Sequence, residues 1–235
     1  MSKEILAIIP ARGGSKGIPG KNLIDLCGRP LIEYTIDAAK GSSFITRIIL
    51  STDSEAIAEV CRAAGVEVPF MRPLELSGDE VPMIDVVLHA LKFLEEKDGY
   101  RPDYVVLLQP TSPLRRSVHI DEAINIMSGS NADTVVSVVP VPHNFNPYSV
   151  MKESGGCLEQ FLEHDERMNS RQVKPVLWGR NGPAVLAFKA EVFKRTGKFY
   201  SGRVVPCRMK ENESIDVDIA DDLELAEYLL NRRDI

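Results

Sequence analysis

The sequence predicts an α/β fold in which helices cover both faces of a doubly wound, mostly parallel sheet. Through the first 140 residues, short apolar runs typical of buried parallel strands alternate with segments of helical periodicity. This alternation favours a parallel sheet with crossover helices on both faces. A glycine-rich, cationic loop follows the first apolar run, where open α/β sheets bind ligands. With 235 residues, 44% of them hydrophobic, the chain is long enough for one domain with a substantial core.

The first half of the chain alternates without interruption. The run 5–9 is continuously apolar, as expected for a strand buried on both faces. Pro30 suits the first turn of a helix, and Asp53-Ser54 suits the cap of the next one. A proline within 66–70 places that short strand at a sheet edge. The expected strands are 5–9, 45–53, 66–70, 104–108 and 134–139, and the expected helices are 30–39, 55–61, 83–94 and 119–127.

The alternation ends at Pro140. From 141 to about 180 the chain is polar and irregular, with several prolines, glycines and a charged run. A loop of this length is uncommon in a domain unless it is functional or pairs with another element, and a disordered insert is the alternative. We expect one catalytic domain from 1–140 and 183–235, with an insertion at 141–182. Its remaining elements are expected to be strands at 184–188 and 204–207 and helices at 190–194 and 221–231.

Composition and charge exclude several classes of function. The formal net charge of -6 argues against a nucleic-acid-binding protein, for which a basic surface is expected. The four cysteines show no C-x-x-C pairing and the four histidines no ligand spacing, which argues against a zinc site or a disulfide scaffold. No basic and apolar leader opens the chain, and no apolar run is long enough to span a membrane. We expect a cytoplasmic protein.

The loop 10–22 is the first candidate site. Glycines permit positive φ and leave backbone N–H groups uncovered, so that these groups can form an anion-binding nest. The loop fits neither the P-loop nor the G-x-G-x-x-G pattern. It suits a polyphosphate, and a flexible turn with solvated lysines is the alternative. The loop contains Gly13, Gly14, Gly17 and Gly20, with the cations Arg12, Lys16 and Lys21.

The stretch 11–22 resembles the signature of the acylneuraminate cytidylyltransferases, also called CMP-sialic acid synthetases. These enzymes couple CTP to a nine-carbon 2-keto sugar acid and release pyrophosphate. Further matches span nearly the whole chain, and the resemblance implies a Rossmann-like nucleotidyltransferase fold with a protruding dimerisation arm at 141–182. It also implies that Arg12 and Lys21 act catalytically on the phosphates. The nucleotide-binding residues it implies are Ala11, Arg12, Gly13, Gly14, Ser15, Lys21, Asn22, Arg72 and Asp79.

The segment 214–218 is the second candidate site. In an extended segment, alternation places Asp216 and Asp218 on one face. Adjacent carboxylates repel each other unless a cation joins them, and Mg²⁺ binds through one or two carboxylates plus substrate phosphates. The resembled family carries its metal-binding aspartates in the same pattern. We expect Mg²⁺, with Mn²⁺ as a substitute, and count Asp218 as catalytic; capping of the last helix is the alternative.

Two further segments resemble the family's sugar-acid site. Gln109 follows a buried strand, and the resemblance implies that it contacts the sugar acid. Within 141–182, Arg171 suits the acid's carboxylate because its planar fork binds a carboxylate bidentately. Asn181 is expected to be a polar contact to the substrate, and packing between subunits is the alternative for both residues. Pro183 and Ala184 depart from the family pattern and leave the sugar acid unspecified.

These observations predict an enzyme, a cytidylyltransferase of the acylneuraminate type. The anomeric hydroxyl of a nonulosonic, sialic-acid-like sugar acid would attack the α-phosphorus of CTP and expel pyrophosphate. The arm implies a homodimer, and neither nucleic acid nor a membrane is expected as a partner. One alternative is a nucleotidyltransferase of the same fold with a different acidic acceptor or nucleotide. The other, a non-catalytic nucleotide-binding protein, would have no need of paired metal carboxylates.

Overall fold

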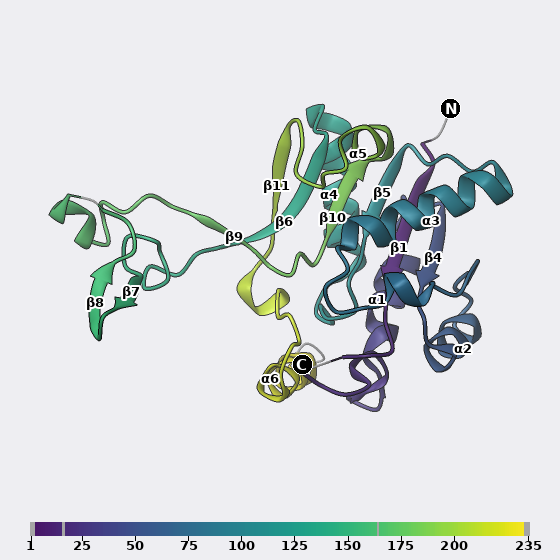
Figure 1. Cartoon of the computed structure of the whole chain (residues 1–235), viewed down its shortest axis with the longest axis horizontal. Coiled ribbons are helices and arrows are strands. Elements are labelled where there is room, and N and C mark those ends of the chain that lie inside the picture. Colours follow the sequence, from purple (N-terminus) through teal and green to yellow (C-terminus); the bar gives the residue numbers. More distant parts are fainter. Residues whose placement is uncertain (1–2, 16, 164, 233–235) are drawn as a thin grey trace.

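The computed structural model describes residues 3–15, 17–163 and 165–232. Lys16, which the sequence placed among the cations of the first loop, lies outside the described residues. The body of the molecule is built on one seven-stranded sheet with the strand order β11-β6-β10-β5-β1-β4, to which β9 is added beside β6 (Figure 1). The strands are β1 (Ile5–Pro10), β4 (Arg47–Ser51), β5 (Tyr104–Leu107), β6 (Thr134–Pro140), β9 (Trp178–Arg180), β10 (Leu186–Lys189) and β11 (Val204–Arg208).

The sheet is mostly parallel, as predicted. β1 pairs in parallel with β4 and with β5, and β11 pairs in parallel with β6. β10 is antiparallel to both of its neighbours and fills the gap between β5 and β6. The strand β1 is fully buried because its continuous apolar run packs against helices on both faces.

Helices cover both faces of the sheet, which confirms the doubly wound arrangement. Alternate residues of the strands supply two separate hydrophobic clusters. Helices α1 (Leu31–Lys40), α2 (Glu55–Ala63) and α4 (Ser117–Ser130) pack into one cluster. Helices α3 (Met83–Asp98) and α5 (Ala190–Thr196) pack into the other.

A third, smaller cluster joins the first loop to the last helix, α6 (Ala220–Asn231). Ile18 of the loop and Val217, just before α6, are both buried in it. The short helix η1 (Lys21–Leu23) and the short strands β2 (Asp25–Leu26) and β3 (Arg29–Pro30) follow Ile18 in the chain, and Leu26 belongs to the same cluster. Packing therefore brings the two segments that carry the main sequence motifs together.

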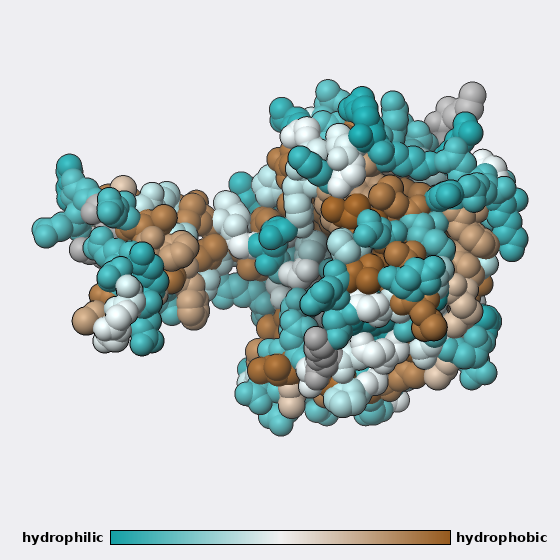
Figure 2. Space-filling model, in the orientation of Figure 1, coloured by the Kyte–Doolittle hydropathy of each residue, from teal (hydrophilic) through white to brown (hydrophobic). Residues whose placement is uncertain are grey.

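The segment 141–182, called the arm below, leaves the body after β6 and projects away from it (Figure 1). It contains the hairpin β7 (Met151–Ser154) and β8 (Cys157–Gln160) and the short helix η3 (Glu166–Asn169), and it returns through β9. Apolar side chains gather on it (Figure 2). Among the most exposed are Phe145, Leu158, Phe161 and Val176, at 66%, 65%, 56% and 75% exposure.

The structure corrects one predicted element. The segment 66–70 forms no strand and contributes only the isolated bridge Ile49↔Glu67, with a second bridge at Thr52↔Met71 just beyond it. Pro69 has no N–H to donate, so a continuous ladder cannot form there. The short helix η2 (Leu74–Leu76) follows this segment, and η4 (Glu211–Glu213) follows β11. Within the described residues, every helix is too short or too polar to cross a membrane.

Candidate active site

A cleft of about 470 Å³ opens beyond the carboxyl ends of β1 and β5. Its walls come from the first loop, the chain after β5, the start of α3 and the segment before α6. This is the edge at which open α/β sheets bind ligands. The lining residues are Pro10, Arg12, Ser15, Gly17, Lys21, Asn22, Arg72, Met83, Gln109, Pro110, Thr111, Asp218 and Ile219.

The first loop is held in shape by its own polar contacts. Asn22 donates from Nδ2 to the carbonyl of Arg12 at 2.9 Å, and the N–H of Gly13 donates to Oδ1 of Asp53 at 2.8 Å. Gly17 approaches the far wall so closely that a Cβ there would lie 2.2 Å from the carbonyl oxygen of Asp218. Only glycine permits this contact. Ala11, Gly13 and Gly14 belong to the loop but do not line the cleft.

Two arginines flank the cleft. Arg72 is buried and donates from Nε to the hydroxyl of Ser51 at 3.0 Å. Burial lowers the pKa of Arg72 to about 10, so its guanidinium is still charged at neutral pH. Arg12 is half-exposed and forms an ion pair with Asp79, with 2.6 Å between Nη2 and Oδ1. Asp79 lies outside the cleft lining and contacts it through Arg12.

Lys21 joins the two walls of the cleft. Its Nζ donates to the carbonyl oxygen of Val217 and to Oδ1 of Asp218, both at 2.8 Å. The Lys21 side chain is only 12% exposed, whereas that of Asp218 is 69% exposed. The cation predicted to act on phosphate and a carboxylate predicted to hold metal are therefore direct neighbours.

The segment 214–218 lies in a loop rather than a strand, but its side chains alternate as predicted. Ile215 and Val217 both pack into the third hydrophobic cluster, which leaves Asp216 and Asp218 on the other side. Asp216 is half-buried, and burial, together with the charge of Asp218, raises the pKa of its carboxyl above the ordinary value. Oδ1 of Asp216 is buried without a hydrogen-bond partner among the described residues.

These carboxylates fit a divalent cation. A buried, unpartnered carboxylate oxygen beside a second carboxylate is a donor pair of the kind that Mg²⁺ uses. In the parts of the chain that the structure describes, no group of three or more acidic, histidine or cysteine side chains surrounds this position. The remaining ligands would have to be water and substrate phosphates, which is also the usual arrangement for Mg²⁺.

Gln109 lines the cleft just beyond the carboxyl end of β5. It donates from Nε2 to the carbonyl of Gly182 at 3.3 Å. Beneath it, Arg115 is buried and donates to the carbonyls of Gln109 and Ala184, at 3.0 and 2.7 Å, and to the hydroxyl of Thr35. Burial lowers the pKa of Arg115 to about 9, while the charge of Asp216 acts in the opposite direction.

Arg115 is a residue whose importance sequence reasoning missed. An arginine in a loop that contains prolines is typical of a solvated surface group, but only 2% of Arg115 is exposed. Thr111 lies between two prolines, at 110 and 113, a pattern typical of a plain turn residue. It lines the cleft, and its carbonyl accepts the N–H of Val217 at 2.7 Å. Neither role follows from a spacing pattern, since both depend on contacts with distant segments.

The structure does not bring Arg171 and Asn181 into this cleft. Arg171 is exposed on the arm. Asn181 is only 6% exposed and its amide is engaged inside the protein. Its Nδ2 donates to the hydroxyl of Ser214 at 2.8 Å, and its Oδ1 accepts from the hydroxyl of Ser137 at 2.6 Å.

A cationic glycine loop at the carboxyl edge of a mostly parallel sheet, faced by two carboxylates, defines an α/β protein of the nucleotide-binding class. The chain belongs to the cytidylyltransferase family. A family model described as "Cytidylyltransferase" matches residues 6–234.

Two curated relatives illustrate the range of the family. The chain is 36% identical over 219 residues to the N-acylneuraminate cytidylyltransferase of Streptococcus agalactiae serotype III (strain NEM316), a match that covers 92% of this chain and 51% of the relative. It is also 36% identical over 228 residues to the CMP-N,N'-diacetyllegionaminic acid synthase of Legionella pneumophila subsp. pneumophila (strain Philadelphia 1), covering 97% and 96% of the two chains. The chain thus spans about half the length of the streptococcal relative and nearly all of the Legionella one.

A solved structure agrees with the fold. The CMP:2-keto-3-deoxy-manno-octonic acid synthetase complexed with CTP superposes with a TM-score of 0.72, over 98% of this chain and 99% of that one. The two sequences are 15% identical, so this likeness concerns the fold alone. It supports the Rossmann-like interpretation of the sheet.

Proposed function

We propose that this chain is a Mg²⁺-dependent cytidylyltransferase that couples CTP to a nonulosonic, sialic-acid-like sugar acid and releases pyrophosphate. The observation that carries the proposal is the convergence of Arg12, Lys21 and Arg72 with Asp218 in one cleft. The names of the streptococcal and Legionella relatives support it, because one is an N-acylneuraminate cytidylyltransferase and the other a CMP-N,N'-diacetyllegionaminic acid synthase.

The cations of the cleft would hold the triphosphate. Lys21 and Arg12 are each paired with a carboxylate, and both carboxylates are substantially exposed. Ion pairs of this exposure stabilise a protein by only about 0.2–1 kcal/mol, so phosphate oxygens can displace the carboxylates. Once turned toward the phosphates, these cations face the negative charge that develops on the transferred and leaving groups. Fixed cations aimed at developing charge are usually the largest catalytic contribution.

Asp216 and Asp218 would hold the metal, Mg²⁺ or Mn²⁺ as a substitute. The metal, when bound, neutralises phosphate charge and orients the α-phosphate for attack. Asp218, which pairs with Lys21 in this structure, would supply an oxygen to the metal, and Lys21 would then be available to the phosphates. Asp216 would contribute its buried Oδ1, which has no hydrogen-bond partner among the described residues.

The sugar acid would bind between the cleft and the arm of a second subunit. Gln109 faces the cleft, whereas Arg171 is exposed on an arm that projects from its own body (Figure 1). The arm also exposes apolar side chains, which is typical of an interaction surface. We therefore propose a homodimer in which each arm brings Arg171 to the partner's cleft, where its planar fork binds the carboxylate of the acid.

A cytoplasmic location is part of the proposal. None of the four cysteines, all of them in the described part of the chain, forms a disulfide. Reduced thiols are typical of a cytoplasm.

Pyrophosphate release tests the function. The reaction would be followed with Mg²⁺ and CTP across N-acetylneuraminate, legionaminate, pseudaminate and Kdo, and each acid would be repeated with ATP, GTP and UTP. We expect release with CTP only and with one nonulosonic acid preferred, since Pro183 and Ala184 border the loop that Gln109 contacts. Binding of CTP by calorimetry with no turnover on any acid would favour a different acidic acceptor. Absence of CTP binding would contradict the proposal.

A further inference from the structure

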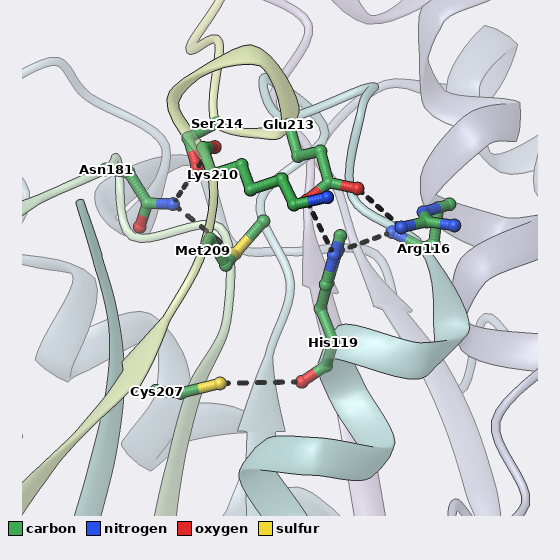
Figure 3. Close-up of polar contacts among 8 residues, drawn as sticks. All are labelled: Arg116, His119, Asn181, Cys207, Met209, Lys210, Glu213 and Ser214. Carbon is green, nitrogen blue, oxygen red and sulfur yellow. Dashed lines mark hydrogen bonds and ion pairs between the residues drawn. The ribbon is translucent and has the colours of Figure 1, made fainter. Parts of the chain in front are cut away.

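The short helix η4 is fixed to the first turn of α4 by a buried carboxylate. Glu213 is only 8% exposed, and its Oε1 forms an ion pair with Arg116 (Figure 3). Its other oxygen, Oε2, lies 3.5 Å from Nε2 of His119, which is itself buried. His119 accepts the backbone N–H of Arg116 at Nδ1 over 3.1 Å, so the proton of a neutral imidazole lies on Nε2, facing Glu213. One carboxylate therefore contacts two side chains of one helical turn.

The next residue is fixed to the sheet. Ser214 accepts from Nδ2 of Asn181 at 2.8 Å and donates to the carbonyl of Lys210 at 2.8 Å. Asn181 is in turn held by the hydroxyl of Ser137 in β6, and that hydroxyl also accepts the N–H of Val185 at 2.8 Å. Figure 3 shows the two anchors side by side, with Glu213 directed toward α4 and Ser214 toward Asn181.

These anchors immediately precede the carboxylates of the cleft. Asp216 follows Ser214 by two residues and Asp218 by four. Beyond them the chain is attached again, where the N–H groups of Asp218 and Ile219 donate to Oδ2 of Asp222 at 2.9 and 3.0 Å. The two aspartates thus occupy a short loop whose entry and exit are both fixed.

The contacts of Glu213 favour a role in positioning the loop 214–219 rather than in stabilising the fold. The Glu213 side chain is 11% exposed and that of Arg116 is 52% exposed, so the ion pair is only half-buried and adds little stability by itself. What the pair provides is one defined arrangement, because the buried Glu213 carboxylate would lose its charged partner in any other position. Asp216 and Asp218 need such definition, since Oδ1 of Asp216 is buried without a hydrogen-bond partner among the described residues and the Asp218 side chain is 69% exposed.

We propose that Glu213, through Arg116 and His119, and Asn181, through Ser214, are positioning residues. They fix the loop that places Asp218 in the lining of the cleft and carries Asp216 two residues before it. The proposal rests on the proposed function for its consequence in metal binding, but its structural part does not. It also gives Asn181 a role different from the direct substrate contact that the sequence predicts.

The test compares Glu213→Gln with Glu211→Gln. Glu211 lies in the same short helix and is exposed, so it is a matched control outside the anchor. Hydrogen exchange of the Val217 N–H, which donates to Thr111 at 2.7 Å, reports the placement of the loop without any ligand. Mn²⁺ binding in the presence of CTP, followed by the electron paramagnetic resonance of the free ion, reports the carboxylates without turnover.

We expect Glu213→Gln to speed exchange across 214–219 and to weaken Mn²⁺ binding by about 10- to 100-fold, the range found for groups that orient metal ligands. Glu211→Gln should change neither. Ser214→Ala, a milder change at the other anchor, should shift both measurements in the same direction. It keeps the proposal testable if Glu213→Gln does not fold.

Three outcomes would overturn the proposal or separate it from the function. Equal behaviour of Glu213→Gln and Glu211→Gln would overturn it. So would exchange that rises equally in β1 and β5, because Glu213 would then be a general stability residue. If the wild-type chain binds no CTP while exchange at 214–219 still responds to both anchors, the proposed function fails and the positioning role stands.

Discussion

The side chain of Asp216, a proposed metal ligand, lowers the stability of the metal-free protein when it is ionised. Burial, the largest effect, raises the pKa of its carboxyl above the ordinary value, and Asp218 adds to the shift. Folding therefore favours the protonated form. The carboxyl of Asp216 therefore adds to the free energy of unfolding at low pH. This contribution is complete below the pKa of the unfolded state, about 3.9, and is lost as the pH rises through the higher pKa of the folded state. At neutral pH the ionised group destabilises the metal-free protein.

We expect Asp216→Asn to raise the melting temperature of the metal-free protein at pH 7 and to abolish pyrophosphate release. A gain of about 2–4 °C corresponds to 1 kcal/mol in a chain of this size. Scanning calorimetry at pH 7 and at pH 4 is the measurement, and the gain should shrink at the lower pH. Asp218→Asn is the control, since an exposed carboxylate should give no gain. A lower melting temperature for Asp216→Asn at pH 7 would contradict this account of the burial.

Arg115 and Arg72 show what the sequence cannot reveal at this scale. Both lie in loops that contain prolines, a pattern equally typical of solvated residues. Their roles depend on backbone carbonyls of distant segments, that of Ser51 for Arg72 and that of Ala184 for Arg115. The resemblance indicated Arg72 but not Arg115. A buried arginine bound only to neutral acceptors has no signature in a single sequence.

At the scale of elements, the local patterns predicted most of the fold. The apolar run 5–9 corresponds to β1, and Ser54 caps α2 by accepting the N–H of Ile57, as its position suggested. The segment 66–70 failed because strand formation at an edge depends on the neighbouring strand, which no local pattern describes. The antiparallel insertion of β10 between β5 and β6 was likewise unpredictable, since strand order is set by long-range packing.

The motifs of the cleft were easier to predict than their geometry. The loop 10–22 and the segment 214–218 were recognisable by residue type and spacing. Their meeting through Lys21 and Asp218 was not, because the two residues are separated by nearly the whole chain. Glu213 was not singled out at all: it lies in a polar run, and only its burial against α4 distinguishes it.

The exposed apolar surface of the arm leads to a prediction about the oligomeric state of the protein. Leu158 and Phe161 are exposed apolar residues at and just beyond β8. If the arm packs on a second copy, replacing both with Ser should remove apolar contact area and shift a dimer toward monomer. Light scattering coupled to size-exclusion chromatography over a dilution series measures this. The exposed pair Phe44 and Tyr228, at 38% and 53% exposure on the body, provides a matched control. An unchanged mass for the arm variant would contradict arm-mediated assembly.

At the scale of the whole molecule, the proposed exchange of arms would make each site a joint product of two chains. Lys21→Ala removes a cation from the body, and Arg171→Ala removes one from the arm. Each variant alone should be inactive or nearly so. Mixed dimers should contain one intact site, built from the body of the Arg171 variant and the arm of the Lys21 variant.

Mixing the two inactive variants under conditions that allow subunit exchange should therefore restore activity. Random exchange in a twofold-symmetric dimer predicts about a quarter of the wild-type sites. Pyrophosphate release before and after mixing is the measurement, and each variant mixed with itself is the control. If activity stays absent after exchange is shown by mass spectrometry, Arg171 acts within its own chain or not at all.

The place of β10 in the sheet has a consequence for the order in which the newly made chain can fold. Within the described residues up to Pro140, β4, β1 and β5 can pair with one another, but β6 finds no partner there. Its neighbour β9 lies at the end of the arm, and its neighbours β10 and β11 come after the arm. During synthesis, β5 must therefore keep an open edge and β6 must wait until the arm has emerged. Such edges pair with other chains, so an arrest of synthesis within the arm would leave an aggregation-prone intermediate.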